Sequence, residues 1–170
     1  ITERTDKTGN VVTLIEDSTT TIEFLSYQNC IRFFTDIDGH KKFTGDKISK
    51  KLKTISDTSW LVYYYMDNPW PVSNSDCVAR MTFTENATKD IAIFSLEAAP
   101  SEYKMESVDR MTYYNVIYTF KDLGNGKVEI NVKARTSPPV NVPNWLLKSA
   151  FPSAPADTVY KLINHLHMVN

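Results

Sequence analysis

The side chains that could carry acid–base or metal chemistry are few in this sequence and stand apart from one another. His40 follows Asp36 and Asp38 in the stretch DIDGH, which is shorter than a calcium-binding loop and ends an expected helix. This position favours a capping or surface role over a metal site. His165 and His167 are two residues apart, so they lie on different faces of a helix and do not chelate one ion. Nucleophile-elbow and phosphate-loop motifs are absent from the sequence, and we predict no catalytic residue, no metal and no cofactor.

Thiols and phenols are the remaining candidates for chemistry. Cys30 and Cys77 are too few for a disulfide framework and lack the spacing of a metal knuckle. Both occupy positions in apolar stripes, so we expect buried thiols. Tyr114 and Tyr118 share one face of an expected strand and could orient a ligand carbonyl, but the sequence shows no base that converges on them. These residues favour binding over catalysis.

Composition excludes several classes of protein. The 170 residues are 42% apolar and 23% charged, as in an ordinary globular domain, and no apolar run approaches the length of a membrane span. The net charge of −1 offers no field that gathers nucleic acid. The lysine-rich stretch 47–53 indicates a solvated edge or outer strand. Because the chain starts at Ile1 without an initiator methionine, localisation stays open between cytoplasm and periplasm.

Periodicity predicts the elements that would position these residues. Residues 1–5 and 10–25 form an expected hairpin, and a helix over 27–37 is capped by Ser26 and ended by Gly39. A closing helix carries Val159, Leu162, Ile163 and Leu166 at helical spacing. Between the helices, alternation predicts six strands joined mostly by short turns, over 46–55, 58–67, 76–85, 89–98, 111–121 and 126–136.

The strand KVEINVKART shows how the layers are arranged. Val128, Ile130, Val132 and Ala134 face one way, whereas the alternate residues from Glu129 onward are polar. An antiparallel sheet with one wet side must cover its other side, and the C-terminal helix is the available cover. We therefore predict an α+β fold in which a curved antiparallel sheet wraps around a long C-terminal helix.

Four separated motifs resemble the START family of lipid-transfer domains in order and spacing, over roughly residues 20–165. The resemblance implies the helix-grip fold and a hollow between sheet and helix for a lipid or another apolar molecule. Ser75 stands where the family usually has an arginine before Asp76, and the family's extra N-terminal helix and strand are not found after Ile1. We therefore expect residues 1–170 to form a single START-like domain lacking its N-terminal helix. The motifs are DIDGHKKF, PWPVSNSDCV, LGNGKVEINV and VPNWLLKSAFPSAPADTVYKLINHL.

The apolar stripes supply the predicted lining of this hollow, although alternation alone does not distinguish a lining from a filled core. The parity of residues 60–66 stays open because Leu61, Tyr63 and Tyr65 are also apolar or aromatic. Tyrosine hydroxyls are the expected polar groups of the hollow. The predicted lining residues are Trp60, Val62, Tyr64, Cys77, Ala79, Met81, Phe83, Phe94, Leu96, Tyr114, Val116, Tyr118, Val128, Ile130, Val132, Val159, Ile163 and Leu166.

Three functions fit this interpretation. The first is non-enzymatic binding or transfer of a lipid or other hydrophobic small molecule, with transient membrane contact and with the C-terminal helix or the loop 99–111 as the gate. The second is a cyclase, aromatase or hydrolase using the same hollow, which requires a titratable group inside, such as Arg80, Glu97 or a histidine. The third is a sensor whose occupancy alters an exposed apolar surface.

Overall fold

The computed structural model describes residues 2–5, 11–68, 73–104, 106–137 and 154–169. Their strands form one sheet in the order β1-β2-β9-β8-β6-β5-β4-β3, antiparallel throughout, and the short β7 pairs in parallel with β5 off this path. The bounds are Thr2–Thr5 (β1), Val11–Phe24 (β2), Ile48–Ser56 (β3), Ser59–Met66 (β4), Ser75–Glu85 (β5), Ile91–Ala98 (β6), Asp109–Arg110 (β7), Tyr114–Gly124 (β8) and Lys127–Thr136 (β9).

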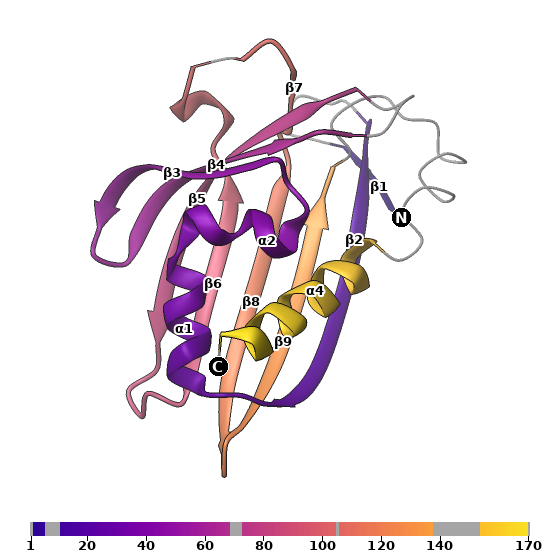
Figure 1. Ribbon diagram of the computed structural model, residues 1–170. Coiled ribbons are helices and arrows are strands. Elements are labelled where there is room, and N and C mark those ends of the chain that lie inside the picture. Colours follow the sequence, from indigo (N-terminus) through magenta and orange to yellow (C-terminus); the bar gives the residue numbers. More distant parts are fainter. Residues whose placement is uncertain (1, 6–10, 69–72, 105, 138–153, 170) are drawn as a thin grey trace.

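Helices α1, α2 and α4 lie against one side of this sheet (Figure 1). They span Tyr27–Thr35, Lys41–Thr44 and Ala154–Met168, and short 3₁₀ turns occupy Ile37–Gly39 and Pro100–Glu102. The predicted helix-grip arrangement is confirmed. The cover, however, is shared by three helices, because α1 and α2 pack on the sheet beside α4 (Figure 1).

The segment between β2 and β3 shows both a confirmed and a wrong prediction. The Ser26 hydroxyl accepts a hydrogen bond from the Asn29 amide at 3.3 Å, so the predicted N-cap of α1 is confirmed. Gly39 does not end the helix, which stops at Thr35. The residue with the left-handed backbone is Gly45, at φ 82°, and it ends α2. The chain thus makes an extra turn over the sheet before β3 begins.

Strand β4 is buried on both faces, which resolves the open parity of residues 60–66. Val62 and Tyr64 point to the helices. Leu61 and Tyr63 belong to a second cluster on the outer face, where they pack with Val78 and the loop residues Ala99 and Tyr103. The run of aromatic residues in β4 therefore serves two separate packing layers.

A buried ion pair holds the loop between β6 and β8 on that outer face. Arg110 binds both carboxylate oxygens of Asp76, at 2.8 and 2.7 Å, and donates to the carbonyls of Pro100, Tyr103 and Lys104. Arg110 thus braces Asp76 in this chain, whose preceding residue is Ser75. These contacts fasten residues 100–104 on the outer face, whereas Met111 at the end of the loop is buried in the helix-facing cluster. Whether the loop 99–111 acts as a gate stays a prediction.

Strand β3 forms one edge of the sheet, as the lysine-rich stretch predicts, and Lys50, Lys51 and Lys53 are exposed there. The stiff corner at residues 69–72 and most of the motif before the last helix, residues 138–153, lie outside the described residues.

Candidate functional site

All predicted lining residues come together between the sheet and the helices: those of the strands lie on the helix-facing side of the sheet, which we call the inner face, and Val159, Ile163 and Leu166 lie on α4. Most of them are buried in one hydrophobic cluster, and Trp60, Phe83, Tyr114 and Ile163 pack against it as half-buried residues. The strand registers explain this, because Tyr64 is opposite Cys77, Val62 opposite Ala79 and Trp60 opposite Met81. Whether each side chain lines a ligand or fills the core remains a prediction.

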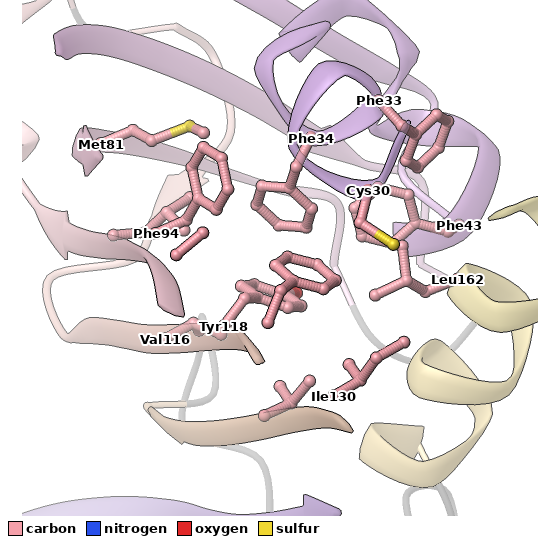
Figure 2. Close-up of a cluster of buried hydrophobic side chains, with 14 of the residues drawn as sticks. Cys30, Phe33, Phe34, Phe43, Met81, Phe94, Val116, Tyr118, Ile130 and Leu162 are labelled. Carbon is pink, nitrogen blue, oxygen red and sulfur yellow. The ribbon is translucent and has the colours of Figure 1, made fainter. Parts of the chain in front are cut away.

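One part of the inner face is filled by aromatic side chains of the helices. The Phe34 ring of α1 lies 4.7 Å from the Phe94 ring and 4.5 Å from the Tyr118 ring, measured between centroids. Phe43 of α2 is 5.6 Å from Phe34, and Leu162 of α4 is fully buried in the same cluster. Figure 2 shows these side chains from helices and sheet meeting one another. This part of the interior is a packed core, so a ligand would lie beyond it.

Next to the aromatic core, and partly within it, the inner face carries polar groups. Tyr64 of β4 and Tyr114 and Tyr118 of β8 are here called the tyrosine cluster; β5 and β6 separate the two strands in the sheet, and the Tyr64 and Tyr114 rings are 6.4 Å apart. Burial raises the pKa of all three phenols, so they stay protonated. Burial likewise raises the pKa of the Cys77 thiol opposite Tyr64. The cluster offers neutral hydrogen-bonding groups, not nucleophiles.

His40 joins this cluster from the helical side, where sequence analysis placed it at a helix end or on the surface. The side chain is 1% exposed, so a surface role is wrong. Its Nδ1 lies 2.9 Å from the Tyr64 hydroxyl and its Nε2 lies 2.7 Å from the carbonyl oxygen of Phe34. Burial lowers the pKa of His40 to about 4, which keeps the ring neutral near pH 7. The 3₁₀ turn after α1 is what carries this ring inward.

Asp46 is a second group that sequence analysis missed. It follows Gly45 at the end of α2, is half-buried, and its carboxylate contributes to the raised pKa values of Tyr64, Tyr114 and Tyr118. Burial raises its own pKa to about 6. The pair Gly45-Asp46 was a usable signal in the sequence for this group. The glycine permits a turn, and the turn places the acid just before β3, where it faces the interior.

The charged groups considered for an enzymatic site point elsewhere. Arg80 and Glu97 are exposed on the outer face, where they are opposite one another and Arg80 binds Glu102 at 2.6 Å. A groove of about 560 Å³ on that face is bordered by charged and polar residues of β2, β8 and β9, including the Glu16–Arg135 ion pair. Ile117 and Ala134 also line this groove.

The described residues lack both a metal-binding cluster and a membrane-spanning helix. They contain no group of three or more His, Cys, Asp or Glu side chains arranged to hold a metal ion. Within the same residues, every helix is too short or too polar to cross a membrane.

Residues 74–161, just over half of the chain, match the model of the Phage T5 receptor-binding protein pb5 family. The chain belongs to this family. The matched stretch begins just before β5 and ends within α4. This member of the pb5 family is also 30% identical over 112 residues to an uncharacterized protein of Pseudomonas aeruginosa, and it spans about half the length of that relative (54%; 65% of the present chain is covered).

Solved structures place this pb5-family chain in the START fold. A STAR-related lipid transfer protein from Xanthomonas axonopodis matches with a TM-score of 0.78 at 22% identity, over 89% of this chain and 85% of that one. Human StAR-related lipid transfer protein 5 matches with a TM-score of 0.76 at 11% identity, over 98% and 80%. The Zhui aromatase/cyclase from Streptomyces matches with a TM-score of 0.62 at 6% identity, over 91% and 94%. The predicted START resemblance is thus confirmed for the fold.

Proposed function

We propose that this protein binds a lipid or other hydrophobic small molecule between the tyrosine cluster and α4, without catalysing a reaction on it. The observation that carries the proposal is the change in character along the inner face. The apolar surface over β4, β5, β6, β8 and β9 carries three phenols, of which Tyr64 and Tyr118 are buried and Tyr114 is half-buried, and His40 and Asp46 act on this group from the helical side. Buried polar groups are costly without partners, and a ligand with one polar end provides both an apolar contact and a partner.

Two further arguments support this function. The STAR-related proteins that share the fold are described by name as lipid transfer proteins. An empty apolar space of about 300 Å³, the lower end of ligand pockets, would cost on the order of 7 kcal/mol. Because a whole domain is stable by only about 5–15 kcal/mol, such a space favours an occupant.

Mass spectrometry of an organic extract tests the proposal. We expect purified protein to release an apolar molecule that native mass spectrometry also detects as a bound mass. Cys77→Leu adds bulk to the inner face beside Tyr64 and should reduce the bound fraction, whereas Arg80→Leu on the outer face is the matched control. An extract with nothing above background, from protein that also fails to bind added lipids, would exclude the function.

Transfer between membranes is the finer form of this proposal. Tyr160, Met168 and Val169 are exposed apolar residues on or next to α4, the helix that would have to move for a ligand to leave. We propose that these residues touch a membrane briefly while α4 is displaced. The protein should then accelerate exchange of a fluorescent lipid between vesicles, and Met168→Asp should slow it. If the protein binds the lipid but does not accelerate its exchange, its function is storage or sensing and not transfer.

A second candidate is a cyclase-type enzyme acting in the same interior. It is favoured by Asp46 and His40, since these are the titratable interior groups that such chemistry needs, and the aromatase/cyclase neighbour shows that the fold accommodates it. Incubation with a short poly-β-ketone and analysis of aromatic products tests it. Product formation that Asp46→Asn abolishes would establish the enzyme, and its absence favours binding alone.

A further inference from the structure

Resting on the proposed binding function, we infer that the ligand carries a hydroxyl group that donates a hydrogen bond to the Tyr64 oxygen. The direction of the hydrogen bonds around His40 leads to this chemical class. Ligands whose polar end only accepts hydrogen bonds, such as ethers, ketones and esters, are disfavoured by the same arrangement.

The Phe34 carbonyl fixes the tautomer of His40. A main-chain carbonyl oxygen can only accept a hydrogen bond, so the Nε2 atom, 2.7 Å from the Phe34 carbonyl, must carry a proton. In a neutral imidazole the other nitrogen then has a lone pair and no proton. Nδ1 therefore accepts, and the Tyr64 hydroxyl, 2.9 Å away, donates to it. The one proton of the Tyr64 hydroxyl is therefore already used in the hydrogen bond to His40.

The hydrogen-bonded pair of His40 and Tyr64 is rigid. The His40 ring is 1% exposed and packs against Phe34 and Phe43, at centroid distances of 4.8 and 5.3 Å. Both of its nitrogens are used, so rotation of the ring would break two buried hydrogen bonds. Burial also keeps the ring neutral, since the pKa of His40 is lowered to about 4. Tyr64 thus presents only lone pairs to any further partner.

The groups around Tyr64 include both acceptors and donors of hydrogen bonds. The Asp46 carboxylate is close enough to act electrostatically on all three phenols, and it also only accepts when ionised. The hydroxyls of Tyr114 and Tyr118 have no hydrogen-bond partner among the described residues, so they can donate. A ligand hydroxyl matches this set, because it donates to Tyr64 and accepts from a neighbouring phenol.

Two probes of equal chain length test the inference. In native mass spectrometry titrations, 1-hexadecanol should bind the wild-type protein about threefold to tenfold more tightly than hexadecyl methyl ether, as expected for one neutral hydrogen bond. Tyr64→Phe should abolish this preference. Tyr63→Phe is the matched control, because the neighbouring tyrosine of β4 faces the outer cluster, and it should keep the preference.

For the variant His40→Leu we expect a shift of the binding preference towards the ether. It releases the Tyr64 proton, so the phenol can donate to the ether oxygen and the ether should gain affinity relative to the alcohol. Because this buried substitution endangers folding, nitrogen NMR of wild-type His40 provides an independent measurement, with a protonated Nε2 and an unprotonated Nδ1 expected.

The outcomes separate the two levels of the proposal. Equal affinities for both probes in the wild type, a preference that survives Tyr64→Phe, or a proton on Nδ1 would overturn the hydroxyl inference and leave the binding function standing. Failure of both probes to bind, together with an empty organic extract, would overturn the binding function and the inference with it.

Discussion

His40 and Asp46 should give the stability of this protein two opposite pH dependences over nearly the same range. The pKa of Asp46 rises from 3.8 to about 6 on folding because the carboxyl is buried, and burial lowers the pKa of His40 from 6.5 to about 4. Each change corresponds to up to about 3 kcal/mol of unfolding free energy. In the wild type the two contributions largely cancel, so single substitutions are needed to reveal them.

For Asp46 the folded chain holds the proton more tightly than the unfolded chain. Its contribution to stability is therefore fully present below about pH 3.8 and is lost as the pH rises through about 6. Asp46→Asn removes this loss. The unfolding free energy of the variant, minus that of the wild type, should rise by up to about 3 kcal/mol between pH 3.5 and pH 7.

For His40 the sign is reversed, because the unfolded chain binds the proton more tightly. Its contribution is present above about pH 6.5 and is lost as the pH falls through about 4. His40→Gln should therefore be most destabilising at pH 7, and its difference from the wild type should shrink by up to about 3 kcal/mol towards pH 3.5.

Urea unfolding followed by circular dichroism, repeated at intervals of half a pH unit, measures both differences. The double variant is the control, since its difference from the wild type should vary little with pH. A flat difference for Asp46→Asn would show that the carboxyl is solvated and does not reach the tyrosine cluster. A flat difference for His40→Gln would refute the buried neutral histidine on which the hydroxyl inference depends.

Three further results are expected from the packing. Phe34→Ala should lower the unfolding free energy by about 3–5 kcal/mol in urea melts, because the ring is 1% exposed and contacts several other rings; a loss below 1 kcal/mol would contradict the packed core. Asp76→Asn should lower the unfolding free energy by about 3–5 kcal/mol, since it leaves the Arg110 charge buried without its partner. It should also expose the loop after β6 to limited proteolysis, and an unchanged cleavage pattern would show that the ion pair does not hold this loop in place. Cys30 and Cys77 should resist alkylation at pH 8 until the protein unfolds, because burial raises the pKa of both thiols; rapid labelling of either would place it at the surface.

The layer architecture could be predicted from the sequence because alternation is a local property. In β9 the apolar residues Val128, Ile130 and Val132 occupy every second position, and a strand can bury them only by turning that face to the helices. The Ser26 cap and the edge position of β3 were predictable for the same reason, since each depends on residues adjacent in the chain.

The polar site was not predictable in this way. His40 and Asp46 lie in a polar stretch typical of a helix end, and only the fold of that stretch over the sheet buries them beside Tyr64, 24 residues further along the chain from His40. Asp76 and Arg110 are likewise 34 residues apart, and no local pattern links them.

The sequence by itself therefore determined which side chains face inward, because strand and helix periods follow from backbone geometry. Only the tertiary structure decided what those side chains meet. Whether an inward residue packs on Phe34 or remains beside the tyrosine cluster depends on the separation and angle of layers built from distant segments, and so does the burial that shifts the pKa values of His40 and Asp46.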